Sequence, residues 1–261
     1  MPHIDSVGIY NFTSGKDWEK LDFPLKLWLQ HTRPLVDQIS LVVYGDMYSI
    51  ESALEANSDG IRIMNNLKIT YLPLEDNNSL AYSFKAMTLA MEELSTTWKL
   101  QIPIDEFLSE WPNFDGLDQS KAYCPTIHNL YGNINTELVG GESITMLPFE
   151  PSRFHYGNQT LVGDSGDVGL PKGKMTKPVH LWHTGYCRKP SALSNRLRTK
   201  VRNEVTYGIP NNRGVLQYTD KEWDYRNWRL LWPNAGLKKV EDSELPKILV
   251  ENKERFNKIQ W

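Results

Sequence analysis

The sequence predicts an α/β protein whose central, mostly parallel sheet is flanked by helices. Short apolar runs alternate with amphipathic segments through the N-terminal part of the chain, and each run ends in a polar or glycine-containing stretch. Beyond Trp111 this alternation gives way to polar loops and short strand-like pieces. We therefore expect a C-terminal α+β extension of the same sheet, within a single domain over residues 1–261.

The four apolar runs are the expected strands: Ser6–Tyr10, Gln38–Tyr44, Leu67–Leu72 and Trp98–Ile104. Strands joined by helical crossovers are parallel, and their carboxyl ends lie at one edge of the sheet, where α/β proteins bind ligands. The loops expected at that edge are Asn11–Gly15, Gly45-Asp46, Glu75–Ser79 and Asp105-Glu106.

Helices are expected between these strands. One covers Trp18–Gln30 with an interruption at Pro24, and a second covers Met47–Ala56. A third carries apolar residues on one face: Leu80, Phe84, Met87, Met91 and Leu94.

The second half is more irregular. Tyr156–Lys174 is rich in glycine and poor in apolar residues, which predicts a long loop. The expected strand-like pieces are Ser143–Phe149 and Val179–Trp182, and helices are expected from about Ser191, over Lys221–Leu231 and over Glu244–Asn257.

Composition excludes several classes of protein. The formal net charge of −3 argues against nucleic acid as the main partner, because phosphate binding usually requires a basic excess. Two cysteines outside any CxxC pattern do not form a disulfide framework, which favours a reducing compartment. The N-terminus lacks the pattern of a signal peptide, and no apolar run is long enough to span a membrane. We expect a cytoplasmic protein.

Two adjacent carboxylates, Asp105 and Glu106, follow the fourth expected strand. An acid at the carboxyl end of a central strand is held at the rim of a cleft. Mg²⁺ and Mn²⁺ prefer such oxygen ligands and leave positions open for phosphate and water. The alternative interpretation is that the pair only ends the strand and caps the following segment.

Three segments resemble a group of GT-A glycosyltransferases related to family 2. WKLQIPIDEFL resembles the strand-to-loop segment W-x-L-x-x-D-A-D-E-F-L, and LWHTGYCRKP resembles H-Y-G-Y-V-R-x-P, with His183 and Arg188 at the matching positions. SLAYSFKAMTLAME resembles the helix that precedes the DxD strand, with Lys85 in its basic position. The three segments occur in the family's order and cover roughly Val7 to Arg202.

The resemblance implies a GT-A, Rossmann-like fold, with a nucleotide-binding half over 1–111 and an acceptor-side half over 112–261. It implies transfer of a sugar from a UDP-, GDP- or dTDP-linked donor to a glycan or other hydroxyl acceptor, with inversion. Asp105 and His183 would hold Mn²⁺ or Mg²⁺, while Lys85 and Arg188 would add positive charge near the diphosphate. Asp46 takes the place of the family's nucleoside-contacting acid. By position alone, the donor base would lie against the backbone of Asn11, Phe12 and Thr13.

The sequence departs from the family pattern at two places. Pro103 stands where the first acid of the DxD motif is expected, so one metal or ribose ligand is missing. Either Glu106 takes over part of that role, or the metal binds weakly and only together with the nucleotide. The segment after the second strand reads GDMYS instead of ending in GSTD. His183 also has an ordinary alternative, because an isolated histidine is often a structural residue.

An inverting transfer needs a carboxylate that accepts the proton of the acceptor hydroxyl. Asp167, Asp164 and Glu106 are the candidates, with Asp167 placed first for its proximity to His183 in the sequence and Glu142 as a weaker candidate. The alternative is that the loop acids are simply solvated.

Two further groups have alternative interpretations. The basic run from Arg188 to Arg202 contains no acid, and it either faces a diphosphate or forms a solvated face. The aromatic residues of the expected helix either pack in the core or form a sugar-stacking wall; they are Trp223, Tyr225, Trp228 and Trp232.

Two rival functions remain. Pro103 favours a catalytically inactive GT-A-like protein that binds nucleotide or glycan. A nucleotidyltransferase shares the strand–helix alternation but normally has a glycine-rich phosphate loop near the N-terminus, and Asn11–Gly15 followed by Lys16 is too sparse to count as one.

Overall fold

The computed structural model describes residues 6–14, 24–45, 66–73, 79–110, 114, 117–118, 123, 125–139, 154–156, 177, 179–194, 224–227, 229 and 234–260. The chain forms two compact units. The first comprises residues 1–19, 23–126 and 146–180, and the second comprises 20–22, 127–145 and 181–261. The assignment of the whole chain to one domain stays a prediction.

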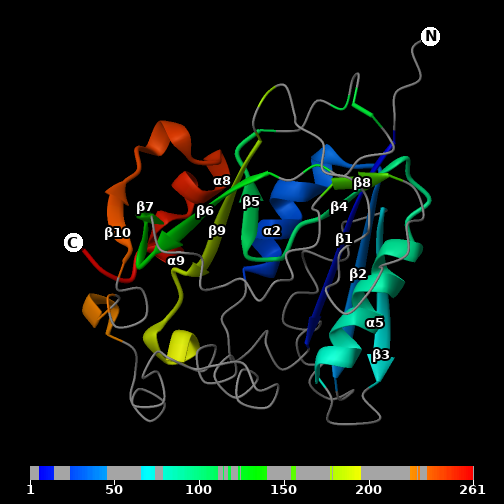
Figure 1. The fold of residues 1–261 in the computed structure, drawn as a ribbon, viewed down its shortest axis with the longest axis horizontal. Helices are drawn as coiled ribbons and strands as arrows, with labels where there is room; N and C mark the ends of the chain where they lie inside the picture. Colours follow the sequence, from blue (N-terminus) through cyan, green and yellow to red (C-terminus); the bar gives the residue numbers. More distant parts are fainter. Residues whose placement is uncertain are drawn as a thin grey trace. The chain divides into compact units, whose positions relative to one another are not determined.

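The first unit is built on a five-stranded sheet in the order β3-β2-β1-β4-β8 (Figure 1). β1 is parallel to β2 and to β4, and β2 is parallel to β3, whereas β8 is antiparallel to β4. The predicted α/β class with a mostly parallel sheet is therefore confirmed. The strands are β1 (Val7–Ser14), β2 (Gln38–Gly45), β3 (Leu67–Pro73), β4 (Trp98–Gln101) and β8 (Phe154–Tyr156).

β1 is longer than the sequence predicts. Residues 11–14 continue the strand, with Phe12 opposite Val42 and Ser14 opposite Tyr44 in β2. The expected loop at Asn11–Gly15 is therefore wrong over these residues. Its polar residues look like a loop in sequence, but the ladder with the long apolar strand β2 satisfies their backbone groups.

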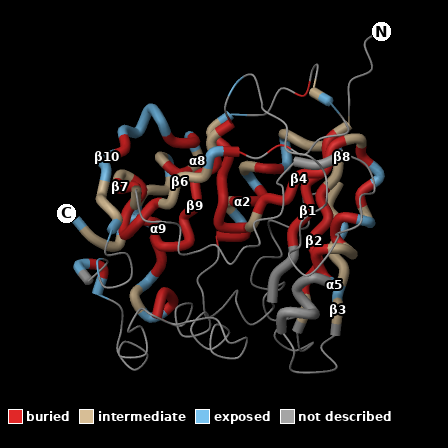
Figure 2. Tube along the Cα trace, viewed as in Figure 1, coloured by how far each residue is buried: buried red, intermediate tan, exposed pale blue. Residues whose placement is uncertain are grey.

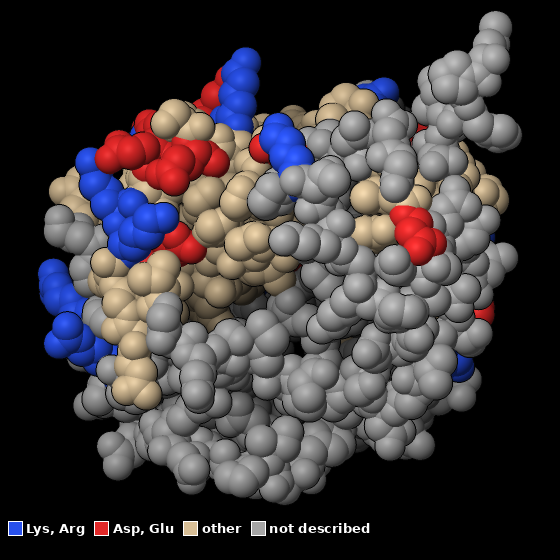
Figure 3. All heavy atoms as spheres, turned by 45° about the horizontal axis from the view of Figure 1, so that its top comes forward, with Lys and Arg blue, Asp and Glu red and all other residues tan. Residues whose placement is uncertain are grey.

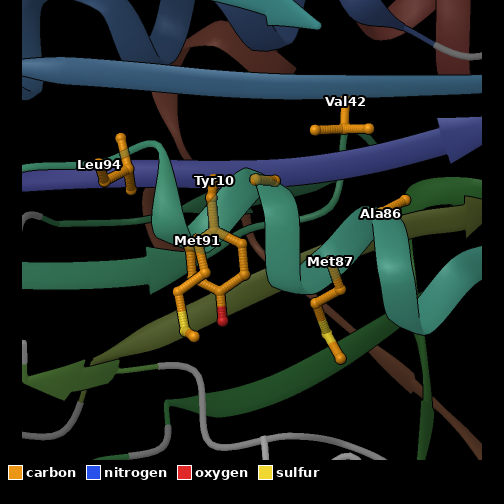
Figure 4. Packing of buried hydrophobic residues seen from close by; sticks show 7 residues of the cluster. Tyr10, Val42, Ala86, Met87, Met91 and Leu94 are labelled. Carbon is orange, nitrogen blue, oxygen red and sulfur yellow. The ribbon is translucent and has the colours of Figure 1, made fainter. Parts of the chain in front are cut away.

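Helix α5 (Ser79–Glu92) covers one face of this sheet, as its apolar spacing predicts. Met87 and Met91 of the helix pack against Tyr10 of β1 and Val42 of β2 (Figure 4). Leu94, which follows the helix, belongs to the same buried cluster. Figure 2 shows that the described parts of β1, β2 and β4 are buried along most of their length.

Helix α2 (Leu25–Thr32) begins directly after Pro24, which is tolerated at a helix start because it has no N–H to donate. The predicted helix over Trp18–Gln30 is confirmed beyond Pro24, and its earlier part lies outside the described residues. A 3-10 turn, η1 (Arg33–Leu35), follows. Trp28 and Leu29 are fully buried, and α2 packs against β5 (Glu106–Leu108).

The fourth strand is shorter than expected. β4 ends at Gln101, and a turn follows in which the backbone N–H of Glu106 donates to the carbonyl of Pro103 at 2.9 Å. Pro103 has no N–H and cannot continue a ladder, so the predicted strand over Trp98–Ile104 is wrong at its end. Asp105 therefore lies in a turn between two strands.

Polar side chains connect three strands of this sheet to the end of α5 and the residue after it. The Glu93 carboxylate accepts hydrogen bonds from Ser40 of β2 at 2.8 Å and from Thr70 of β3 at 2.6 Å. Lys99 of β4 is 1% exposed, and its ammonium donates to the carbonyl of Met91 at the end of α5, at 2.9 Å. Both groups join the strands to the helix that covers them.

The second unit contains an antiparallel hairpin that the sequence analysis missed. It consists of β6 (Thr126–Tyr131) and β7 (Asn133–Val139), joined at Gly132, whose φ of 73° suits glycine. β10 (Gly236–Lys239) is antiparallel to β7, and β9 (His180–Tyr186) lies beside β6. The strand expected from Val179 thus exists and is longer than predicted.

The helices of this unit are short. Residues 190–194 are helical, in agreement with the helix expected near Ser191. The helix predicted over Glu244–Asn257 is instead interrupted, because η4 (Asp242–Glu244), α8 (Lys247–Glu251) and α9 (Lys253–Phe256) are separate turns. Within the helix expected over Lys221–Leu231, the structure describes a 3-10 turn, η3 (Tyr225–Asn227).

Exposed charges of the second unit pair with one another. Lys239 contacts Glu241 at 2.8 Å, Lys247 contacts Glu251 at 3.4 Å, and Lys253 pairs with Asp242. Figure 3 shows acidic and basic side chains next to one another at the upper left of the face that it draws, whereas other charged side chains stand apart. In the described part of the chain, no helix is long and apolar enough to cross a membrane.

Candidate functional site

The first unit has a topological switch point between β1 and β4. From β1 the chain adds β2 and β3 on one side, and then returns to place β4 on the other side. The loops at the carboxyl ends of such neighbours diverge, which leaves a crevice where open α/β sheets bind ligands. The parallel register, with Tyr10 opposite Gln101, brings the carboxyl ends of both strands to the same edge.

Several predicted residues lie on the two strands that flank this switch point or directly after them. Asn11 is buried in β1, one residue beyond the paired Tyr10. Phe12 and Thr13 continue β1 opposite Val42 and Val43, and the structure describes only their backbone. The contact of these three residues with a donor base stays a prediction.

Asp105 and Glu106 follow β4 at the same edge. Each is 5% exposed, so both carboxylates are held inside the protein. Glu106 begins β5, and the following Ser109 donates its N–H to the carbonyl of His180 at 3.0 Å. The tight turn from Pro103 and the short strand after it fix the backbone on both sides of the pair. Burying charge costs free energy unless partners or a ligand compensate it, and both residues have interactions within the chain.

The two carboxylates fit a hard divalent cation in part. They supply two oxygen donors, and among the described residues no group of three His, Cys, Asp or Glu side chains is close enough to hold a metal. A cation here would take its other ligands from phosphate and water, as Mg²⁺ commonly does. Asp46, Asp164, Asp167 and Glu142 lie outside the described residues.

Lys85 lies on α5, and its side chain is exposed. It is therefore available to solvent, and its role near a diphosphate stays a prediction.

His183 lies in β9 of the second unit and is 6% exposed. Its Nδ1 is 2.9 Å from Oδ1 of Asn129, which can only accept, so Nδ1 donates this hydrogen bond. The ring also meets Tyr186 edge-on, with 5.3 Å between centroids. The hydrogen bond from Nδ1 fixes the orientation of the imidazole ring. Asp105 belongs to the first unit and His183 to the second, so their shared ion stays a prediction.

Arg188 follows β9 and is 3% exposed. Its carbonyl accepts a hydrogen bond from the hydroxyl of Tyr225, and the hydroxyl of Tyr131 donates to the carbonyl of Tyr225 at 3.1 Å. Burial raises the pKa of the Tyr225 hydroxyl, and it also raises the pKa of the neighbouring Cys187 thiol. Of the four aromatic candidates, Tyr225 is thus a core residue, and Trp223, Trp228 and Trp232 lie outside the described residues.

A polar pair that was not predicted from the sequence lies on the opposite face of the second unit's sheet. His128 Nδ1 is 2.6 Å from Oε1 of Glu137, and the imidazole stacks on Trp182 with 4.3 Å between centroids. Lys238 lies 3.5 Å from the second oxygen of Glu137. His128 and Asn129 are consecutive in β6 and point to opposite faces, so this pair is separate from His183. The alternation in the segment IHNLYGNINTELV was the signal for the strands that carry it.

No protein-family model matches the sequence, and no curated protein matches it. Among solved structures, S. aureus TarS 1–349 has a TM-score of 0.40 and 12% identity, covering 85% of this chain and 72% of that chain. The same protein in complex with UDP has a TM-score of 0.41 and 11% identity, covering 86% of this chain and 71% of that one. A Bacillus anthracis protein designated a glucose-1-phosphate thymidylyltransferase has a TM-score of 0.33 and 11% identity, covering 98% of this chain and 96% of that chain.

Proposed function

We propose that this chain is a GT-A-type glycosyltransferase that moves a sugar from a nucleotide-diphosphate donor to a hydroxyl acceptor, with inversion. The observation that supports it best is the pair of buried carboxylates, Asp105 and Glu106, directly beyond one of the two strands that flank the switch point. The three segments that resemble this group of enzymes provide the second line of support.

In this proposal the carboxyl edge of the first unit binds the donor. The backbone of Asn11, Phe12 and Thr13 lines the base pocket, and Asp46 contacts the nucleoside. Asp105, with Glu106 beside it, holds Mn²⁺ or Mg²⁺, which when bound neutralises charge on the diphosphate. The constrained turn keeps both carboxylates in place before the donor arrives, which lowers the reorganisation that the reaction requires.

Other parts of the chain supply the remaining groups. His183 adds an imidazole ligand, and the hydrogen bond between its Nδ1 and Asn129 orients the ring. Arg188 and Lys85 add positive charge near the leaving diphosphate. Asp167, Asp164 or Glu106 accepts the proton of the acceptor hydroxyl as that oxygen attacks the anomeric carbon.

One observation favours a second candidate, a GT-A-like protein that binds nucleotide or glycan without catalysis. Pro103 stands at the position of the first acid of the motif, and its carbonyl is engaged by the N–H of Glu106. A residue without a side-chain oxygen cannot supply the missing ligand.

Turnover separates the two candidates. Release of nucleoside diphosphate from a panel of UDP-, GDP- and dTDP-sugars should be measured with Mn²⁺ and with a chelator. The proposed enzyme turns over at least one donor, and Asp105→Asn lowers the rate by about a hundredfold or more, as expected for loss of a preorganised charge. Asp37→Asn is the matched control, because Asp37 lies before β2 and accepts the N–H of Val7 at 2.7 Å, away from the carboxyl edge. Binding without turnover of any donor would favour the second candidate.

A further inference from the structure

β4 carries a second buried polar side chain that the proposed mechanism does not use. Gln101, the last residue of β4, is 5% exposed. Its Oε1 is completely buried and accepts no hydrogen bond from the described residues. A buried acceptor without a donor is rare in native proteins and calls for a specific reason, such as a bound ligand.

The neighbouring Lys99 is a buried polar residue whose side chain does have a hydrogen-bond partner. Lys99 and Gln101 are two residues apart in β4, so their side chains leave the same face of the sheet. Lys99 is also buried, but its ammonium caps the carbonyl of Met91 at 2.9 Å. Gln101 lies closer to the carboxyl edge, where the helix end no longer offers such a group.

The position of Gln101 coincides with the switch point. It is opposite Tyr10 of β1 in the parallel register, and it is the last paired residue before the turn that carries Asp105 and Glu106. Burial without a donor and location at the ligand-binding edge are independent observations. A leucine or methionine would fill the same space without leaving an acceptor unsatisfied.

We propose that Gln101 is a binding residue of the donor site, and that its Oε1 accepts a hydrogen bond from an N–H or O–H group of the nucleotide sugar. This inference rests on the proposed function. The donor group has three possible sources within one ligand: the imide N–H of the base, a ribose hydroxyl or a hydroxyl of the transferred sugar.

The test combines calorimetric affinity with thermal unfolding of the full chain. Gln101→Met removes the acceptor and keeps the size of the side chain. We expect the affinity for the nucleotide sugar to fall about fivefold to tenfold, as for one lost hydrogen bond. We also expect Tm without ligand to stay the same or rise, because the unsatisfied acceptor is gone. Gln101→Leu repeats the test with another apolar shape.

Gln38→Met is the matched control. Gln38 is also in the first unit, but its carboxamide donates to Ser95 at 2.8 Å and accepts the N–H of Ser95 at 3.0 Å. The same substitution should therefore lower Tm and leave nucleotide affinity unchanged.

Analogues identify the source of the hydrogen. Wild type and Gln101→Met are compared with UDP-glucose, UDP, 2′-deoxy-UDP and CDP, the last of which lacks the imide N–H. The analogue that lacks the bonded group should bind both proteins equally, as in a double-mutant cycle.

Three results would overturn the inference: unchanged affinity of Gln101→Met for every ligand, a fall in Tm like that of Gln38→Met, or failure of both apolar variants to fold. If the wild type binds no nucleotide at all, the proposed function itself is wrong. If the wild type binds nucleotide and Gln101→Met binds it with the same affinity, only the inference about Gln101 is wrong.

Discussion

Glu93 offers a direct test of what holds the first unit together. Its carboxylate, 8% exposed, accepts the hydroxyls of Ser40 at 2.8 Å and Thr70 at 2.6 Å, and Lys68 approaches the same group at 3.0 Å. These contacts connect β2 and β3 to the segment that follows α5. The perturbation is Glu93→Gln, which keeps the size of the side chain and removes its charge.

The magnitude follows from the bonds lost. A hydrogen bond to a charged group contributes about 1.5–3 kcal/mol, and glutamine retains one acceptor oxygen for one of the two hydroxyls. The exposed Lys68 adds little, because solvent screens it. We therefore expect the free energy of unfolding to fall by about 2–3 kcal/mol at neutral pH.

The effect depends on pH with a defined sign. Burial alone would raise the pKa of Glu93, but the hydrogen bonds from Thr70, Ser40 and Lys68 outweigh it and lower the pKa below the ordinary value of 4.5. The unfolded chain therefore takes up the proton first as pH falls. The stabilisation is complete above the unfolded pKa and is lost as pH falls through the folded one.

Urea unfolding at neutral pH and at about pH 3.5 measures both effects. The wild type should lose more stability on acidification than Glu93→Gln. Glu92→Gln is the matched control, since Glu92 is the exposed preceding residue and should change stability by less than about 0.5 kcal/mol. The reasoning is refuted if Glu93→Gln unfolds like the control, or if its acid sensitivity equals that of the wild type.

Three further predictions concern other parts of the chain. Gly8→Ala should cost about 1–3 kcal/mol in urea unfolding, because an added Cβ would lie 2.5 Å from the hydroxyl of Thr96; an unchanged midpoint would contradict this. His31→Gln should reduce the loss of stability between about pH 7.5 and pH 5.5, because burial lowers the pKa of His31 below 6.5 and the unfolded chain is protonated first; equal pH dependence would contradict it. Glu137→Gln should lower the unfolding free energy by about 1–3 kcal/mol and change the imidazole ¹⁵N shifts of His128, and unchanged shifts would show that the carboxylate does not set its tautomer.

The parallel sheet could be predicted because its strands are continuous apolar runs between amphipathic helices. β2, β3 and α5 agree with their expected ranges within two residues. The polar end of β1 could not be predicted, because only pairing with β2 shows that residues 11–14 are extended. At β4, Pro103 was a local signal for the end of the strand, and the apolar residues around it concealed that signal.

The second unit was harder to predict from the sequence for a physical reason. Its hairpin buries polar residues, including Asn133, Thr136 and Glu137, so its strands do not form apolar runs. Their partners come from distant segments, as when Asn129 meets His183. The strand order predicts which edge of the sheet carries Asn11 and Asp105. The burial of a side chain such as Gln101 depends on tertiary packing, which no short sequence pattern encodes.

The central claim is that nucleotide binds at the carboxyl edge between β1 and β4. Calorimetry with UDP, GDP and dTDP, each with and without Mn²⁺, tests it most directly in the wild type, Asp105→Asn and the amino-edge control Asp37→Asn. The account predicts metal-dependent binding of at least one nucleotide, weakened at least tenfold by Asp105→Asn and unchanged by Asp37→Asn. Nucleotide affinity that changes neither with Mn²⁺ nor in Asp105→Asn, or no binding of any nucleotide, would contradict it.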